Sequence, residues 1–290
     1  MIKMSRSEKA FDIVNYIILT ILGIVTLYPL LNVLAISLST YTAYVESPLM
    51  VFPTKIDFEA YIRILSNPLI LSSYNNTIFV TVVGTVVNVI MTVLTAYPLA
   101  KAKVRGVRVF MFFIMFTMLF NGGLIPTFLV VKNLHLVNTL WALILPTAIS
   151  TYNFVIVLNF FESIPDSLEE SAKIDGAGHL RILFSIIVPL STPVLATIAL
   201  FYGVGNWNRF FDAVIYINDR SKWTLSLLLR EIITENSDVL NALDPMNAVT
   251  VYPKTVQSAT IVVTILPIIC AYPFLQKYFI KGIMAGAVKG

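Results

Sequence analysis

Residues 64–100 read ILSNPLILSSYNNTIFVTVVGTVVNVIMTVLTAYPLA and contain no Asp, Glu, Lys or Arg. Because an α-helix rises about 1.5 Å per residue and the hydrocarbon core of a bilayer is about 30 Å thick, roughly 20 apolar residues are enough for one crossing. Five other stretches also lack these four residue types: 13–45, 109–131, 133–161, 182–208 and 255–276. The pattern predicts an all-α integral membrane protein with six transmembrane helices.

The composition argues against a water-soluble helical protein. Hydrophobic residues make up 57% of the chain and charged residues 12%, whereas soluble domains average roughly 45–50% and 25%. The helices of a soluble core would carry a charged outer face with a period of 3.6 residues, and none of the six stretches does. Since one charge at the centre of a membrane helix costs about 2.5–3.5 kcal/mol, stretches without charge indicate selection for insertion.

The positive charges indicate how the chain is oriented. The formal net charge is +4, but the basic residues gather beside the apolar stretches, which favours a membrane topology signal over nucleic-acid binding. The main cluster lies between the second and third stretches and consists of Lys101, Lys103, Arg105 and Arg108. The positive-inside rule places this loop in the cytoplasm. An even number of crossings then places both termini there and the loops around 41–73 and 212–254 outside.

The chain lacks the motifs of an enzyme. Its one cysteine, Cys270, lies within the last apolar stretch, and His135 and His179 are far apart in the sequence. There is no Gly-Lys dipeptide, so a phosphate-binding P-loop is excluded and the chain cannot hydrolyse ATP by itself. We expect no catalytic residue, no metal site and no cofactor in this chain.

Residues 162–189, ESIPDSLEESAKIDGAGHLRILFSIIVP, interrupt the apolar pattern between the fourth and fifth stretches. Asp166 with Glu169, and Ser167 with Glu170, have the spacing of a capping box, which predicts the start of a short helix. Gly176 is suited to the left-handed conformation that ends one.

Two further features follow from this segment. Glu169 and Lys173 are spaced for an i,i+4 ion pair on one side of the first helix, with Leu168 and Ala172 on another. A second short helix is predicted from His179 towards Val188, ending at Pro189 and leading directly into the fifth span.

A cytoplasmic helix-turn-helix that is continuous with a spanning helix is suited to act as a lever. The alternative is an amphipathic loop that lies on lipid headgroups, which would be rich in Lys and Arg. The first helix instead carries Glu169, Glu170 and Asp175 against only Lys173. This acidic balance favours docking to a protein partner.

The same segment resembles a known family. Glu170, Ser171 and Ala172, followed by Gly176 and then by the run Ile186, Ile187, Val188 and Pro189, resemble the EAA loop of bacterial ABC importer permeases, in which Glu-Ala-Ala is followed by Gly and by Ile-x-Leu-Pro. The chain departs from that pattern at Ser171 and Val188. The tail 276–290, QKYFIKGIMAGAVKG, is similar to the end of the smaller permease subunit of maltose-type carbohydrate importers. The stretch NGGLIP at 121–126 resembles the subgroup for complex or uronate-containing oligosaccharides.

The resemblance implies an oligosaccharide permease of the bacterial cytoplasmic membrane that works by alternating access. Residues 1–290 would form a single transmembrane domain with the coupling loop 162–189 and the cytoplasmic tail 276–290. Its partners would be a second, homologous permease subunit, two cytoplasmic ATPase subunits that bind ATP and Mg, and an extracytoplasmic solute-binding protein.

The resemblance also assigns residues to the contacts with the ATPase. In the coupling loop these are Glu169, Glu170, Ser171, Ala172, Asp175, Gly176 and Pro189. In the tail they are Lys281, Gly282, Gly286, Lys289 and Gly290. The alternative for the tail is a frayed chain end.

Polar residues near the outward end of the fifth stretch are candidates for the substrate path. Sugars need flat apolar faces together with hydrogen-bonding groups, and both are present in Tyr202, Asn206, Trp207, Asn208, Arg209 and Phe210, with Asn88, Tyr97, Asn153 and Asn159 as further candidates. The aromatic residues also suit a membrane-interface belt, and the Asn residues suit interhelical hydrogen bonds of about 0.6 kcal/mol each. Arg209 is either a snorkelling anchor or a partner for an acidic sugar.

Two other classes of function are less well supported. A secondary carrier or channel that needs no ATPase would be expected to place ionisable residues in mid-membrane, and the six stretches have no Asp, Glu, Lys or Arg. An intramembrane enzyme would need an acid, base or metal set within a span. The sequence therefore favours an ATP-driven importer subunit.

Overall fold

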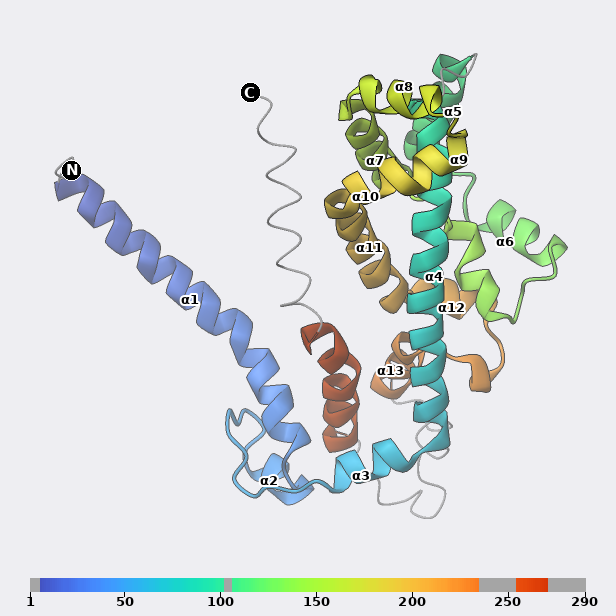
Figure 1. The fold of residues 1–290 in the computed structure, drawn as a ribbon. Coiled ribbons are helices and arrows are strands. Elements are labelled where there is room, and N and C mark those ends of the chain that lie inside the picture. Colours follow the sequence, from blue (N-terminus) through green and yellow to red (C-terminus); the bar gives the residue numbers. More distant parts are fainter. Residues whose placement is uncertain (1–5, 102–105, 235–253, 271–290) are drawn as a thin grey trace. The chain divides into compact units, whose positions relative to one another are not determined.

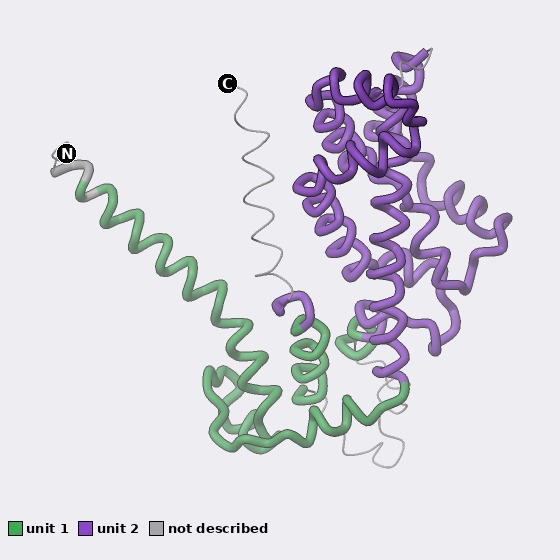
Figure 2. The backbone as a smooth tube through the Cα atoms, viewed as in Figure 1, with its two compact units in different colours: residues 1–68, 229–266 green, residues 69–228, 267–290 purple. Residues whose placement is uncertain are grey.

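The computed structural model describes residues 6–101, 106–234 and 254–270. Over these ranges the chain is helical, and its only β feature is an isolated antiparallel bridge between Ser39 and Ile56. The fold is therefore all-α, as the apolar pattern predicts. The chain divides into two compact units, residues 1–68 with 229–266 and residues 69–228 with 267–290 (Figure 2).

The first unit is built on a long N-terminal helix. It contains α1 (Arg6–Ser37), α2 (Tyr41–Glu46), α3 (Glu59–Ser66) and most of the helix Lys254–Cys270 (Figure 1). A small core of Ala35, Ile36, Ala43 and Met50 joins the end of α1 to α2 and the loop after it. Most of the large apolar side chains of α1 before this core are exposed, as expected for a helix surrounded by lipid or by another membrane subunit.

The second unit is organised around α4 (Pro68–Ala100), an uninterrupted helix of 33 residues (Figure 1). The elements that follow are α5 (Val107–Leu119), α6 (Leu124–Asn133), the 3-10 turns Leu140–Leu143 and Leu145–Thr147, α7 (Thr151–Ser163), α8 (Asp166–Ile174), α9 (His179–Ile182), a π-helical turn (Leu183–Ile187), α10 (Val188–Leu190), α11 (Thr192–Trp207), α12 (Phe210–Tyr216), the 3-10 turn Arg220–Lys222 and α13 (Leu225–Ile233).

Two apolar cores pack against α4 within this unit. One contains Val93, Ala96 and Tyr97 of α4 together with buried side chains of α7, the α9–π segment and α11. The other contains Val80 of α4 together with buried side chains from the 3-10 turns, α12 and α13.

Within the described residues, up to five candidate spans fall at the predicted stretches, and two of these are single long helices. Phe11–Ser37 and Pro68–Ala100 are long and apolar enough to cross a bilayer by themselves. Three further candidates are bent pairs: Val107–Leu119 with Leu124–Asn133 (117°), Leu140–Thr147 with Thr151–Ser163 (49°), and His179–Leu190 with Thr192–Trp207 (84°). The stretches 109–131, 133–161 and 182–208 are therefore each bent at a short break. The last stretch is a shorter apolar helix, Lys254–Cys270, within the described residues.

Proline and glycine explain these breaks. The first falls at Asn121–Gly123, where Gly123 has a φ of 89°, and the second at residues 148–150, just after Pro146 in its 3-10 turn. Left-handed backbone and missing N–H groups interrupt the hydrogen-bond ladder of a helix.

The break in the fifth stretch lies later than the sequence suggests. The helix that begins at His179 does not end at Pro189 but continues to Leu190, and the 84° bend follows at Ser191. Pro189 has no N–H to donate to the carbonyl four residues earlier, and the turn before it, Leu183–Ile187, is wound as a π-helix. Pro193 lies in the first turn of α11, where a missing N–H costs nothing.

Candidate functional site

The N-terminus of helix α8 is not capped in the way that the sequence predicts. Its first residue is Asp166, it follows Pro165, and no side chain caps it. The Asp166 carboxylate instead accepts a hydrogen bond at 2.6 Å from Nζ of Lys101, 65 residues earlier in the chain. Neither predicted capping box caps the helix, and the Asp166 carboxylate, which would start one of them, is bound by Lys101 instead.

The end of α8 follows the prediction. Gly176 has a φ of 79°, its N–H donates to the carbonyl of Lys173, and the N–H of Ala177 donates to the carbonyl of Ala172. These two bonds form a Schellman motif, which satisfies carbonyls that the helix leaves free at its end. The glycine therefore fixes the length of the helix and the direction of the chain beyond it.

The two neighbouring glutamates of α8 differ in exposure, with Glu169 buried and Glu170 exposed. Glu169 is only 3% exposed, and its carboxylate lies 3.4 Å from Nζ of Lys173, the predicted i,i+4 pair. Ala172 packs against the core that contains Tyr97. The remaining predicted contact residues of this segment, Glu170, Ser171, Asp175, Gly176 and Pro189, are exposed. The structure thus offers Glu170 and Asp175, rather than Glu169, to a partner.

A buried chain of polar side chains crosses from α4 to α11. Asn88, which is fully buried, donates both amide hydrogens to the carbonyls of Thr147 and Ala148, at 2.9 and 3.0 Å. These carbonyls lie at the break before α7, where backbone groups have no partner within a helix. In a membrane such groups must find a partner in the protein or in a wet cavity, and Asn88 supplies one.

The buried series of polar side chains continues from Asn88 towards the end of α11. Nδ2 of Asn206 donates to Oδ1 of Asn88 at 3.0 Å, and Oδ1 of Asn206 accepts from Arg209 at 2.8 Å. Arg209 also forms an ion pair with Asp212 at 2.9 Å, and its side chain is 13% exposed. These contacts give Arg209 protein partners on α11 and α12, which an arginine that snorkels to the headgroups would not need.

An open pocket of about 580 Å³ lies beside this polar chain. It is lined by Pro146, Thr147, Ile149, Ser150, Tyr152, Asn153, Phe201, Tyr202, Gly205 and Arg209. Three of the predicted substrate-path residues, Asn153, Tyr202 and Arg209, meet there. The Tyr202 hydroxyl accepts from the N–H of Ser150 at 2.9 Å and lies 2.7 Å from the Thr92 hydroxyl, so the pocket wall is tied to α4.

The other predicted substrate-path residues lie elsewhere. Asn206 is 1% exposed and is part of the polar chain, and Asn208 is exposed and donates to the Val204 carbonyl at the end of α11. Trp207 is half-buried and, like these two, is not part of the pocket wall. The predicted tail residues Lys281, Gly282, Gly286, Lys289 and Gly290 lie outside the described residues.

Sequence reasoning missed Thr147, Ser150 and Gly205 in the pocket wall, and it missed the role of Lys101. Pro146 followed by Ser150 was the available signal for the first two, because a proline followed by an N-cap residue marks a helix that stops and restarts. Ser150 does serve as the N-cap of α7. No local signal distinguishes Lys101 from its basic neighbours, because its partners are distant in sequence.

The described part of the predicted outward loop after α12 is held by its own hydrogen bonds. Asp219 accepts from the N–H of Ser221 at 2.9 Å and from its hydroxyl at 2.8 Å, and these bonds hold the pKa of Asp219 below its usual value. Asn138 binds the N–H groups of Asn218 and Asp219 from the other side. These bonds fix the backbone of residues 218–221.

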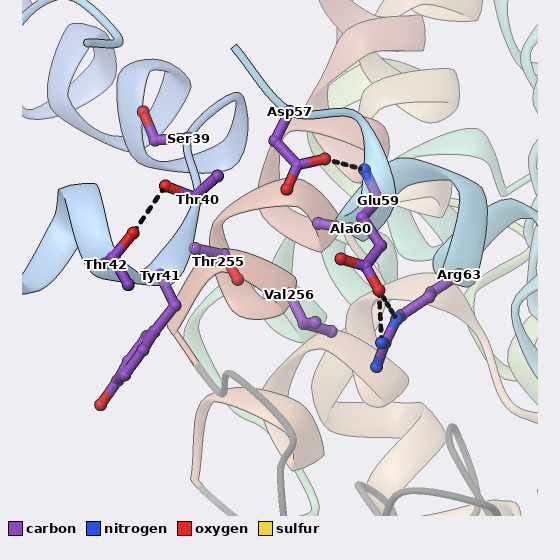
Figure 3. Close-up of a pocket in the computed structure, with 10 residues that line it drawn as sticks. All are labelled: Ser39, Thr40, Tyr41, Thr42, Asp57, Glu59, Ala60, Arg63, Thr255 and Val256. Atoms are coloured by element: carbon purple, nitrogen blue, oxygen red, sulfur yellow. Dashed lines mark hydrogen bonds and ion pairs between the residues drawn. The ribbon is translucent and has the colours of Figure 1, made fainter. Parts of the chain in front are cut away.

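A smaller pocket of about 170 Å³ lies in the first unit (Figure 3). Most of its polar groups already serve the backbone or each other. Asp57 accepts from the N–H of Glu59 at 2.8 Å, Glu59 pairs with Arg63, and Thr40 caps α2. The hydroxyl and carboxylate groups visible in Figure 3 are thus largely explained by helix starts. Within the described residues there is no cluster of three or more potential metal ligands.

Comparison with known proteins identifies the family. The family described as "Binding-protein-dependent transport system inner membrane component" matches residues 69–284. The chain belongs to this family. It is therefore a membrane permease subunit, and it is not an enzyme.

Similar proteins cover almost the whole permease. It is 44% identical over 284 residues to the polygalacturonan/rhamnogalacturonan transport system permease protein YtcP of Bacillus subtilis, covering 98% of this chain and 99% of that protein. It is 43% identical over 286 residues to protein LplC of the same organism, with 99% and 97% covered. A solved chain of a bacterial ABC transporter involved in the import of the acidic polysaccharide alginate is 39% identical, has a TM-score of 0.88 and covers 96% of this permease and 100% of that chain.

Proposed function

We propose that this permease is one of the two membrane subunits of an ATP-driven importer that passes an acidic oligosaccharide from an extracytoplasmic binding protein into the cytoplasm. The family match over residues 69–284 carries the transport role. The two full-length likenesses, to a polygalacturonan permease and to an alginate importer, support an acidic polysaccharide fragment as the cargo.

The proposed topology has six crossings with both termini in the cytoplasm. Two straight helices, three bent pairs and the helix Lys254–Cys270 correspond to the six apolar stretches. The basic residues beside these stretches support this orientation through the positive-inside rule. The bends support a cavity, because broken helices at membrane depth occur where protein or water satisfies the free backbone groups.

Helix α8 is the proposed docking element for a cytoplasmic ATPase subunit that binds ATP and Mg. Glu170 of α8 and Asp175 just after it are exposed, while Ala172 packs against the permease core and Glu169 is buried. A short acidic helix with one side anchored in the membrane domain can transmit a displacement from the ATPase to that domain without bending. Two such ATPases, a second homologous permease and the binding protein complete the proposed assembly.

A displacement of α8 would reach the substrate pocket through the bent pair of the fifth apolar stretch, His179–Leu190 with Thr192–Trp207. From α8 the chain passes through Gly176 into the helix His179–Leu190 and, after the 84° bend at Ser191, into α11. α11 carries Tyr202, Gly205 and, just beyond it, Arg209 of the pocket wall. Closure of the ATPases on ATP would therefore bias the pocket between inward-open and outward-open states.

Docking through Glu170 is tested by reversing its charge. We expect Glu170→Lys to lower uptake by the assembled importer about tenfold or more, the effect of losing about 1.4 kcal/mol of docking energy, and to lower ATPase recovery with an affinity-tagged permease in mild detergent. Glu46→Lys, the same change at an exposed residue of α2, should leave both unchanged. Coupling through α8 is wrong if no ATPase copurifies with the wild type and Glu170→Lys transports normally.

The acidic cargo is tested by comparing tritiated tri-galacturonate with its methyl ester. A charge-assisted hydrogen bond from Arg209 to a carboxylate is worth about 1.5–3 kcal/mol, so Arg209→Gln should reduce the preference for the free acid about tenfold or more. Any preference of the binding protein for one of the two sugars affects wild-type and Arg209→Gln permease equally, because both are assayed with the same binding protein. Uptake of neutral arabinotriose but of neither galacturonate by the wild type would contradict an acidic cargo. An unchanged preference in Arg209→Gln would remove Arg209 from its recognition.

A further inference from the structure

Lys101 is a buried lysine at the cytoplasmic end of α4. It makes specific contacts that a lysine serving only to set the membrane orientation would not need. Its side chain is 3% exposed, whereas lysines that only fix membrane orientation lie in water or headgroups. Burial of an ammonium group is costly unless it is paired and hydrogen-bonded. A lysine at this position therefore needs specific partners, and the structure provides two.

The two partners lie at the junction between α7 and α8. Nζ of Lys101 donates to the carbonyl of Ile164, the first residue after α7, and to the carboxylate of Asp166, the first residue of α8. Only Pro165 separates them. One ammonium group thus holds the end of one helix and the start of the next to the end of α4.

A second contact holds α4 to the same segment one turn earlier. Tyr97, four residues before Lys101, is buried in the core onto which Ala172 of α8 packs, and its ring meets that of His179 edge-on at 6.5 Å. Tyr97 in the last turn of α4 thus contacts the start of α9 and shares a core with Ala172, and Lys101 just beyond that turn binds the start of α8.

We propose that Lys101 is a positioning residue that clamps α8 to α4, so that a displacement of α8 moves α4 directly as well as reaching α11 through the chain. This inference rests on the proposed function of α8 as the docking element. The clamp has a defined consequence within the second unit. α4 is straight from Pro68 to Ala100 and carries Asn88, so a shift of its end is passed to the polar chain beside the pocket.

The clamp is tested by spin-label distances within the permease, in the assembled importer with Cys270→Ser. Labels are placed on the exposed residues Val86 of α4 and Ser167 of α8. In the wild type we expect one narrow distance distribution that stays the same without nucleotide and with ATP and vanadate. In Lys101→Met, which removes the charge and keeps the length, we expect the distribution to broaden and to shift on addition of ATP and vanadate.

Three further variants separate positioning from general instability. Lys101→Arg retains a cation and should restore much of the narrow distribution. Lys132→Met, at an exposed lysine of α6, should leave it unchanged. Asp166→Asn removes the charge from the more exposed partner, whose side chain is 65% exposed. It should broaden the distribution in the same direction even if Lys101→Met does not assemble.

The outcomes distinguish a failure of the proposed clamp from a failure of the proposed docking through α8. A distribution that stays narrow in both Lys101→Met and Asp166→Asn, or one that already shifts with nucleotide in the wild type, overturns the clamp and leaves docking through α8 intact. Failure of any ATPase to assemble with the wild type overturns both. Growth of the unclamped population by about tenfold in Lys101→Met, equivalent to about 1.4 kcal/mol, is the result that we expect.

Discussion

At Gly84, α4 passes close to the side chain of Asn206 on α11. A Cβ atom at this position would lie 2.8 Å from Nδ2 and 3.2 Å from Cγ of Asn206. Asn206 has little freedom to move away, because its amide is held by Asn88 on one side and by Arg209 on the other. The absence of a side chain at Gly84 therefore permits the whole polar chain to form.

We predict that Gly84→Ala destabilises the permease by about 1–3 kcal/mol, the usual cost of adding a methyl group to a packed interior. The thermal unfolding midpoint of the purified importer in detergent should fall measurably. Gly203→Ala is the matched control on the facing helix, because its Cβ would make an ordinary contact of 3.6 Å with Thr85 Oγ1. Equal midpoints for the two variants would show that the polar chain does not depend on this close approach.

At the scale of single residues, the sequence identified the unusual side chains but not their partners. Asn206 and Arg209 are noticeable because they are polar residues at the end of an apolar run. Asn88 was weighed only as a further candidate, since its role depends on a helix break 59 residues later. A partner at that distance becomes visible only once the fold brings the two segments together.

At the scale of elements, the end of α8 could be predicted but its start could not. Its end depends on a glycine and two backbone bonds within six residues of sequence, and such local motifs can be read from residue types. Its start depends on Lys101, which takes the Asp166 carboxylate that a local motif would have used. The prediction failed where a distant residue offered a stronger partner.

Two glycines that follow α8 differ in what they allow, and this difference is testable. Gly176 has a φ of 79°, whereas Gly178 has a φ of −75°, and neither would have a heavy atom within 4 Å of a Cβ. A left-handed backbone costs a residue with a side chain about 1–2 kcal/mol. We therefore predict that Gly176→Ala lowers ATP-dependent uptake and the recovery of ATPase subunits, whereas Gly178→Ala leaves both near the wild-type level. Equal effects would mean that the turn does not set the direction of the coupling segment.

The positions of the spans could be predicted, but the way they bend could not. A lack of charge reports which residues enter the bilayer, and this signal is the same for straight and bent helices. The prolines at 146, 189 and 193 and the glycines at 122 and 123 lie in or near the observed breaks. Pro98 lies within the continuous helix α4, so proline alone does not decide a break. The surrounding side chains that satisfy the freed carbonyls, such as Asn88, decide it.

At the scale of the second unit, α4 acts as a spine with polar contacts at three levels. Near its start, Asn76 donates to the carbonyls of Ser221 and Trp223. In its middle, Asn88 holds the break before α7, and just beyond its end Lys101 holds the start of α8. From residue 76 to residue 101 a straight helix spans about 38 Å, more than the thickness of the hydrocarbon core. The loop at 218–223 and α8 therefore lie at opposite ends of a membrane-length rod.

This separation yields a prediction for the whole permease in its membrane. In a Cys270→Ser background, Asn218→Cys and Ser167→Cys each place one thiol at an exposed position, in the loop and on α8 respectively. The positive-inside rule predicts that the α8 end lies in the cytoplasm. A membrane-impermeant maleimide added to intact cells should label Asn218→Cys, and should label Ser167→Cys only after the membrane is permeabilised. Labelling of both thiols in intact cells would place the two ends of α4 on one side of the membrane, which the length of the helix does not allow for a span. The reverse pattern would keep the span and invert the permease, so α8 could no longer receive a cytoplasmic ATPase.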